Sequence, residues 1–325
     1  MSAPRLSIVI PLYDDLEEAL GMIHAVERSF AERIEIEFLL VDVRGDWSEK
    51  FGQAGLKSTV RYLTAPNLPA AKNLSATAAA GEFLFFLLPG IFPTPGAIER
   101  MMAHFGKDPG LIGVAGRWCN ATGKLEVGYN VRRFPTFTAL ILDILLLNKL
   151  FPRNRFTRSY KMHDFDHNSA IHAEHVNDCV FMLRRRATGQ YGGFDQRYEP
   201  GWFDQLEFCH TVNQAGVRIL YDPEAKFTSN ERVPLIDRVV EDRYLEYRRA
   251  ECRYIRTHFG KLAVAVARGA TAIGMLQRLG FSIILPDAAR KWFLKRLRSY
   301  VNDNYVRSLR QEYWTVFKWS LRGQP

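Results

Sequence analysis

Three polar residues in the first quarter of the chain stand where an apolar segment ends or a helical segment begins. Asp42 directly follows the apolar run Ile34–Val41, where a short carboxylate can accept hydrogen bonds from a base or a ribose. The alternative role for Asp42 is a helix N-cap. Lys72 and Asn73 open an Ala-rich helical segment, and an ammonium beside a helix N-terminus suits a diphosphate. The alternative for this pair is an exposed lysine beside a structural asparagine.

Histidines gather in one later segment with three acidic residues among them. They are His163, His167, His172 and His175. Their spacing matches no compact set of metal ligands, so the sequence favours surface histidines over a transition-metal site. The four cysteines contain no CxxC pair, which argues against a zinc ribbon and a disulfide scaffold and favours reduced thiols in the cytosol.

The segments that must position these residues alternate between strands and helices. Apolar runs predict strands at Leu6–Ile10, Ile34–Val41, Val60–Leu63 and Phe83–Leu88, and helical spacing predicts helices at Leu16–Phe30 and Ala70–Ala80. This rhythm predicts an α/β fold with a parallel, Rossmann-like sheet flanked by helices. Ligands of such sheets bind at the carboxyl ends of the strands. Those ends are Pro11–Tyr13, Asp42–Arg44, Pro66–Asn67 and Pro89–Gly90.

Positive charge is concentrated in the C-terminal part of the chain. The 325 residues carry a net charge of +9, and residues 235–325 hold 18 Lys and Arg against 8 Asp and Glu. Asp287–Leu321 also mixes cations with bulky aromatic residues, which suits a helix lying on anionic lipid. The alternative is a helix that packs its aromatic stripe on the domain. No run of 18 apolar residues lacks a charge, so we expect no membrane-spanning helix.

Neither export nor nucleic-acid binding is expected from the sequence. The N-terminus has no basic region and only a short apolar run, so it does not look like a signal peptide. No recognised nucleic-acid-reading motif is present. We therefore expect a cytoplasmic protein that is peripheral at the inner face of the cell membrane.

Several segments together resemble bacterial family-2 glycosyltransferases, and most of all their rhamnosyltransferase-like branch. They are LSIVIPLYDD, LLVDVRGDWSE, NLPAAKNLSATAAAGEFLFFL, RRFPTFTALILDILLLNKLFPRNRFTRSYKMHDFDH, FMLRRRATGQYGGFDQRYEPGWFDQLEFCHTVNQAGVRILYDPEA and YIRTHFGK. The resemblance covers roughly Leu6 to Lys261. It implies a mostly parallel GT-A domain over residues 1–232, followed by a helical, basic, membrane-associating extension over residues 233–325.

The resemblance also implies a function. It implies an inverting glycosyltransferase that moves a sugar, rhamnose as the best guess, from a nucleotide-diphosphate donor to a lipid-linked or polysaccharide acceptor in bacterial surface glycan synthesis. The implied nucleotide-binding residues are Pro11, Tyr13, Asp42, Asn67, Lys72 and Asn73, with Trp202 on the acceptor side. The alternative is a catalytically silent glycosyltransferase-like subunit that binds glycan or a partner enzyme. A third reading is a membrane scaffold without a sugar ligand.

Three positions depart from the family pattern. The fourth strand ends in Leu88-Pro89-Gly90 where the family has acidic metal ligands, and Lys226 follows Pro-Glu-Ala where the family often has a histidine nearby. We therefore expect no metal cofactor and predict that fixed cations meet the diphosphate, with Lys72, Arg153 and Arg155 as candidates.

The third departure concerns the general base. The family's base position falls on Gln205, whose amide cannot take a proton. Asp204 and Glu207 lie one helical turn apart on one face, so the sequence predicts Asp204 as the first choice of base and Glu207 as the second. The alternative for both is an acidic residue that caps or stabilises the start of a helix.

Overall fold

The computed structural model describes residues 6–12, 16–29, 35–43, 58–120, 122–125, 127–229, 244–284 and 303–322. The chain forms two compact units, which we describe separately. The sheet unit consists of Met1–Phe134 and Lys161–Leu235, and the helical unit consists of Pro135–Tyr160 and Ile236–Pro325. The predicted Ala-rich helix and the predicted strands fall in the sheet unit, whereas the basic C-terminal residues fall in the helical unit.

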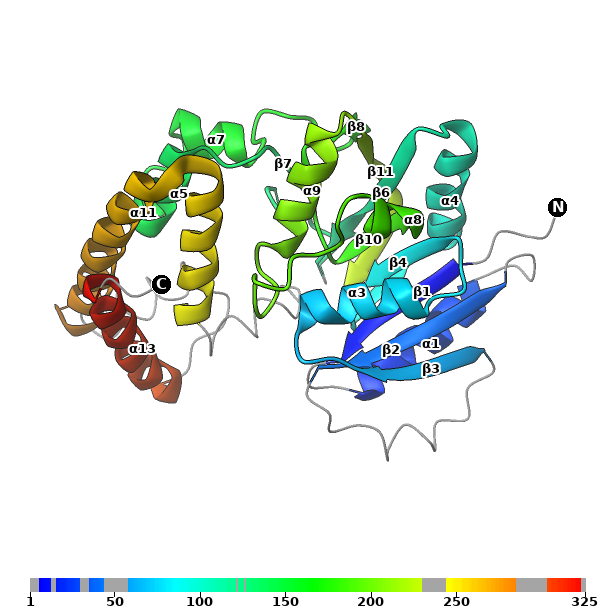
Figure 1. Ribbon diagram of the computed structural model, residues 1–325, viewed down its shortest axis with the longest axis horizontal. Coiled ribbons are helices and arrows are strands. Elements are labelled where there is room, and N and C mark those ends of the chain that lie inside the picture. Colours follow the sequence, from blue (N-terminus) through cyan, green and yellow to red (C-terminus); the bar gives the residue numbers. More distant parts are fainter. Residues whose placement is uncertain are drawn as a thin grey trace. The chain divides into compact units, whose positions relative to one another are not determined.

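One mixed sheet forms the centre of the sheet unit (Figure 1). Its first half is parallel, in the order β3 (Thr59–Thr64), β2 (Ile36–Asp42), β1 (Leu6–Leu12) and β4 (Phe83–Leu87). Next comes β10 (Val180–Arg184), antiparallel to both β4 and β6 (Leu111–Cys119). β11 (Arg218–Ser229) is parallel to β6, while β5 (Ile91–Pro93) and β8 (Ile171–His172) pair antiparallel with β11. The predicted α/β fold with a mostly parallel sheet is confirmed.

Helices cover both faces of this sheet. α1 (Leu16–Ser29) and α4 (Ala97–Lys107) pack on the face to which Leu6, Ile8 and Ile10 point. α3 (Leu68–Ala78) and α9 (Asp204–Gln214) pack on the opposite face, with Val9. Since both faces are covered, β1 and β4 are buried along their whole length and read as continuous apolar runs. The unit also contains α8 (Arg186–Gln190) and a small second sheet of β7 (Val131–Arg132) and β9 (His175–Val176).

A buried carboxylate ties the first strands to the segment between α3 and β4. Glu37 Oε1 accepts hydrogen bonds from Ser7 Oγ at 2.6 Å, from the Ala80 amide at 2.6 Å and from the Gly81 amide at 3.2 Å. Because Ser7 and Glu37 belong to neighbouring strands, this network fixes where α3 ends relative to the sheet.

A second buried carboxylate fixes α4 to β11. Asp222 is 1% exposed and accepts hydrogen bonds from Arg100 Nε and pairs with His104 Nε2, each at 2.7 Å. Asp222 lies at the point where the register of β11 against β6 shifts. The two α4 side chains therefore satisfy a carboxylate at an irregular part of the sheet.

The helical unit consists of α5 (Phe137–Ile144), α6 (Leu147–Leu150), α7 (Arg155–Tyr160), α11 (Tyr244–Ile284) and α13 (Asp303–Leu321). The apolar pattern of residues 136–150 predicts one continuous helix, within the predicted domain of residues 1–232. Instead, the helix is interrupted at Leu146, whose φ of 61° is left-handed, and the segment packs with the C-terminal helices. The helical unit is therefore larger than the predicted extension over residues 233–325.

α11 is the dominant element of the helical unit. It bends at Gly260, whose φ of 86° and ψ of 177° are not helical. By length and composition alone, Tyr244–Phe281 is apolar enough to cross a membrane, the one such helix in the described residues. The sequence analysis expected none, because Arg268 interrupts the apolar run. An 18-residue window within this helix holds at most two charged residues, so Arg268 alone does not exclude a membrane-spanning helix on these criteria.

Candidate functional site

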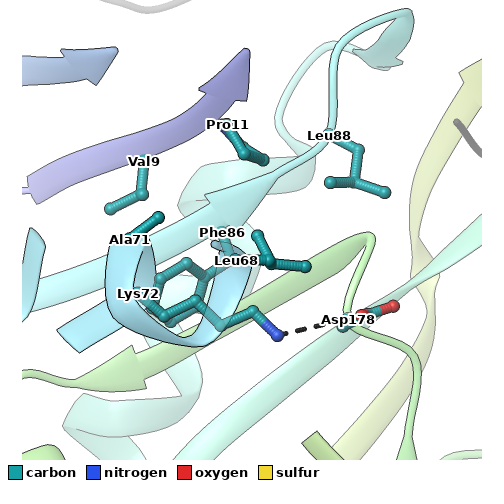
Figure 2. Close-up of a pocket in the computed structure, with 8 residues that line it drawn as sticks. All are labelled: Val9, Pro11, Leu68, Ala71, Lys72, Phe86, Leu88 and Asp178. Carbon is teal, nitrogen blue, oxygen red and sulfur yellow. Dashed lines mark ion pairs between the residues drawn. The ribbon is translucent and has the colours of Figure 1, made fainter. Parts of the chain in front are cut away.

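A small cavity lies at the carboxyl ends of β1 and β4, beside the first turns of α3 (Figure 2). Its solvent-accessible volume is about 10 Å³, which is room for roughly one water molecule. It is lined by Val9, Pro11, Leu68, Ala71, Lys72, Phe86, Leu88 and Asp178. Only Lys72 and Asp178 bring charge to a lining that is otherwise apolar. Two of the residues predicted from the sequence, Pro11 and Lys72, meet at this cavity.

Lys72 places a buried ammonium group between two carboxylates. The side chain is 3% exposed, and its Nζ lies 2.8 Å from Asp204 Oδ2 and 3.8 Å from Asp178 Oδ2. Nζ also lies 4.9 Å from the centre of the Phe194 ring, a cation–π contact. Burial alone would lower the pKa of the Lys72 ammonium, but Asp204 and Asp178 together raise it. Lys72 is therefore a fixed positive charge at the wall of the cavity.

Asp204, the first predicted base, is the buried partner of this lysine. Its side chain is fully shielded from solvent, and burial raises the pKa of its carboxyl above the ordinary value. Oδ2 accepts the Lys72 hydrogen bond, and Oδ1 has no hydrogen-bond partner among the described residues. The carboxylate is therefore positioned to hold Lys72, while its role as a base stays a prediction.

Asp178 is the carboxylate that the sequence analysis missed. It lies two residues before β10, is 19% exposed and lines the cavity beside Lys72 (Figure 2). Asn177 holds this turn, because its Oδ1 accepts hydrogen bonds from the Cys179 and Val180 amides at 3.1 and 2.8 Å. The available signal was an Asn-Asp pair directly before a fully apolar strand. No spacing rule linked that pair to Lys72, which is more than a hundred residues earlier.

Two predicted asparagines use their amides within the chain. Asn67 is the N-cap of α3: its Oδ1 accepts from the Ala70 amide at 2.9 Å, and its Nδ2 donates to Glu199 Oε1 at 2.8 Å. Asn73 forms two hydrogen bonds with the backbone of Phe194, of 2.7 and 2.8 Å. These contacts fix the start of α3 and so aim Lys72 at the cavity. A nucleotide contact by either side chain stays a prediction.

Three other predicted residues of the sheet unit, Asp42, Glu207 and Trp202, are not among the residues that line the cavity. Asp42 ends β2, is fully buried and accepts a hydrogen bond from the Tyr62 hydroxyl. Glu207 is half-buried on α9 and accepts from the Tyr198 hydroxyl at 3.1 Å. Trp202 is half-buried in the loop before α9, and Tyr13 lies outside the described residues.

Arg153 and Arg155 belong to the helical unit rather than to the unit that contains the cavity. Both are exposed at the start of α7, and the Arg155 guanidinium lies 4.7 Å from the centre of the Phe156 ring. Their predicted contact with a diphosphate remains a prediction.

The turn after β4 does not fit a divalent metal. Leu88 and Pro89 carry no ligand atoms in their side chains, and Gly90 has a left-handed φ of 77°. A Cβ at position 90 would collide with Glu18 Oε1, so a side chain there would require the end of the Glu18 side chain to move, and the left-handed backbone would be strained. Within the described residues, no three His, Cys, Asp or Glu side chains gather as metal ligands. Of the four clustered histidines, His163 and His172 are exposed, as the sequence indicated. The prediction of a surface residue is wrong for His167, which is buried and whose Nε2 bonds the Met162 carbonyl at 3.0 Å, and His175 is half-buried.

No protein-family model matches the chain, and no curated protein matches its sequence. Solved structures do match. GalNAc-T7, solved with UDP, GalNAc and Mn²⁺, aligns over 79% of this chain with a TM-score of 0.54 and 13% identity. This chain spans about half the length of that protein, 51%. A mannosyltransferase from Pyrobaculum calidifontis, solved with GDP-Man and Mn²⁺, aligns over 99% of this chain and 88% of its own, with 12% identity and a TM-score of 0.49. Strand order and the GalNAc-T7 likeness together show that the chain has the GT-A fold found in glycosyltransferases.

Proposed function

We propose that the chain is an inverting glycosyltransferase whose nucleotide-diphosphate sugar donor binds over the carboxyl ends of β1 and β4, with one diphosphate oxygen reaching the Lys72 ammonium at the small cavity there (the Lys72 cavity). The observation that carries the proposal is a buried ammonium at the carboxyl ends of β1 and β4, where parallel sheets bind ligands. The GT-A fold supports the reaction class. Rhamnose as the sugar and a lipid-linked or polysaccharide acceptor rest on the sequence resemblance. The acceptor and donor are the partners of a peripheral enzyme at the inner face of the cell membrane, attached through residues 233–325.

Lys72 supplies the positive charge that a divalent metal supplies elsewhere. A departing nucleoside diphosphate gains negative charge, and a fixed ammonium in a shielded cavity stabilises that charge without reorganisation. Asp204 lies 2.8 Å from Nζ, whereas Asp178 lies at 3.8 Å, so Asp178 is the weaker partner. A diphosphate oxygen therefore replaces Asp178 at the ammonium, and Asp204 keeps the lysine in place.

Asp178 then becomes the general base. Released from Lys72, its partly exposed carboxylate takes the proton of an acceptor hydroxyl. The hydroxyl oxygen forms a bond to the anomeric carbon, the bond from that carbon to the diphosphate oxygen breaks, and the nucleoside diphosphate leaves. Asp204 anchors the lysine in this scheme, and Glu207, already bonded to Tyr198, is the second choice of base.

Trapping the product of a radiolabelled donor in Asp178→Asn tests the assignment. The variant keeps the shape of the side chain but cannot accept the proton, so we expect turnover to fall about a hundredfold or more with donor binding retained. Asp166→Asn removes an exposed acid outside the cavity and is the matched control. If Asp178→Asn keeps full turnover and a folded Asp204→Asn variant loses it, the general base is Asp204 instead of Asp178.

A catalytically silent subunit is the second candidate, and one observation favours it. Gln205 occupies the position that the family uses for its base, is 4% exposed, and has no hydrogen-bond partner for either amide atom among the described residues. A buried amide of this kind can bind a hydroxyl but cannot accept a proton from it. Nucleotide binding without turnover of any donor would favour this reading.

A further inference from the structure

The second half of α11 carries an uninterrupted apolar surface that the helical unit leaves exposed. Its large side chains are Leu262, Val266, Ile273, Leu276 and Ile283, which are 81%, 49%, 54%, 49% and 67% exposed. Successive members are separated by three, four or seven residues, so they form one stripe along the helix. Gly269, which is exposed, and Gly280, which is half-buried, stand in the two seven-residue gaps. We call this surface the α11 stripe.

Both arginines of this half-helix point away from the stripe, into the unit. Arg268 donates to the backbone carbonyls of Trp319 and Ser320 at the end of α13, at 2.6 and 3.2 Å. Arg278 is 6% exposed and donates to the Ile144 carbonyl at the end of α5, at 2.8 Å. Both charges therefore lie at helix C-termini, where cations are favoured, and the stripe itself is uncharged.

The opposite face of α11 is fully used for packing. Ala267, Thr271 and Met275 are buried, and Gly274 lies so close to the Ile144 carbonyl that a Cβ would collide with it. One face of this half of α11 therefore packs on α5 and α13, and the opposite face, the α11 stripe, remains available to a partner. A helix that crossed a bilayer would carry α13, with its charged residues, into the hydrocarbon, which is costly.

Positive charges precede the stripe along α11, and they favour a partner with negative charge. Lys261 is exposed directly before Leu262, and Arg253 and Arg256 are exposed on the half of α11 that precedes the bend at Gly260. The two acids of α11 do not oppose them there: Glu246 is in the first turn, and Glu251 is buried against Arg248. An apolar stripe preceded by exposed cations is the pattern of a helix that lies in a lipid interface.

We propose that the α11 stripe docks on an anionic bilayer, with the half of α11 after Gly260 in the plane of the membrane and its apolar side chains at the boundary between headgroups and acyl chains. The inference rests on the membrane association in the proposed function and specifies the surface and its orientation. The stripe supplies an apolar contact with the bilayer, which salt does not screen. The adjacent cations supply an electrostatic contact, which salt screens.

Vesicle sedimentation of the full chain tests the inference. The vesicles contain equal parts of phosphatidylcholine and phosphatidylserine, and the variant is Val266→Glu/Ile273→Glu, which places two charges on the stripe at exposed positions. We expect its partition coefficient to fall at least roughly tenfold. Val127→Glu is the matched control, because Val127 is 40% exposed in the sheet unit, and it should sediment like the wild type. Alkaline carbonate should release the wild type from the vesicles.

Four results would overturn the inference. Equal sedimentation of the double variant excludes the stripe, and retention after carbonate means that α11 spans the bilayer. A wild-type dimer that the double variant converts to a monomer, with vesicle binding unchanged, assigns the stripe to a second copy of the chain. If the wild type does not sediment with any vesicles, the membrane association in the proposed function is excluded as well. Titration with nucleoside diphosphates, which the stripe variants should leave unchanged, separates that outcome from failure of the donor site.

Discussion

At the scale of single residues, the Lys72–Asp204 pair links stability and chemistry. Both side chains are shielded from solvent, and each compensates the charge of the other. Removing one partner leaves an unpaired buried charge, whereas removing both leaves a site that apolar side chains can fill. The two effects can be separated by substitution.

We expect Lys72→Met to lower the free energy of unfolding by about 3–5 kcal/mol, because the Asp204 carboxylate loses its partner. Lys72→Met/Asp204→Leu should recover most of that loss. Urea denaturation of the variants measures both values. Lys124→Met, at an exposed lysine, is the matched control and should change the stability by less than about 0.5 kcal/mol. A double variant less stable than Lys72→Met would contradict the claim that Lys72 and Asp204 mainly compensate the charge of each other.

His175 gives the sheet unit a sensitivity to acid. Burial, together with Arg132 and His210, holds the pKa of His175 well below its ordinary value near 6.5. Below about pH 6.5 the unfolded chain binds a proton at this position that the folded chain does not, so the free energy of unfolding falls as the pH falls. Above that pH this contribution is constant.

The slope from one such proton reaches about 1.4 kcal/mol per pH unit, and His175→Gln should remove it. Denaturation at a series of pH values between neutral and mildly acidic measures the slope. His172→Gln, at an exposed histidine of β8, is the control for loss of a histidine side chain. An unchanged slope in His175→Gln would assign the acid sensitivity to another group.

At the scale of elements, strands were predictable where burial imposes a continuous apolar run. β1 and β4 are covered on both faces, so their sequences alone located the sheet edge where Pro11 and Lys72 meet. The reversed direction of β10 left no mark in its sequence, because an antiparallel strand buried on both faces is equally apolar. Asp178 was missed for the same reason: only the pairing of β10 with β4 brings its turn to the cavity.

Side chains already engaged within the chain were also beyond the reach of sequence patterns. Asn73 reads as a ligand-binding residue at a helix start, yet its amide is bonded to the backbone of Phe194, which follows it by 121 positions. The break at Leu146 depends on a left-handed backbone that no glycine or proline marks. Such features depend on tertiary packing, which overrides local preference.

Two glycines of α11 offer a matched test of how that helix packs. Gly274 faces the Ile144 carbonyl without room for a Cβ, whereas Gly269 has no atom near the position of a Cβ. We expect Gly274→Ala to destabilise the helical unit by about 1–3 kcal/mol through overpacking. Gly269→Ala should stabilise it by about 0.5–1 kcal/mol, because alanine favours the helix. Thermal unfolding measures both, and equal effects of the same sign would contradict the packing of α11 on α5.

At the scale of the whole molecule, the two units divide the proposed work. The sheet unit has the GT-A fold and holds the Lys72 cavity, and the helical unit carries the basic residues and the α11 stripe. The charge asymmetry in the sequence indicated a basic C-terminal part, and its role at a membrane stays a proposal. The inclusion of residues 135–160 in the helical unit was not predictable, because it depends on contacts with α11, such as that of Arg278 with Ile144.

The central claim is that a nucleoside diphosphate binds at the Lys72 ammonium without a divalent metal. Calorimetric titration of the full chain with a panel of nucleoside diphosphates in EDTA tests it most directly. We expect one nucleotide to bind the wild type in EDTA and to bind the folded Lys72→Met/Asp204→Leu variant at least roughly tenfold more weakly, a loss of about 1.4 kcal/mol. Binding that requires Mn²⁺ or Mg²⁺, or equal affinity in the double variant, would contradict the claim.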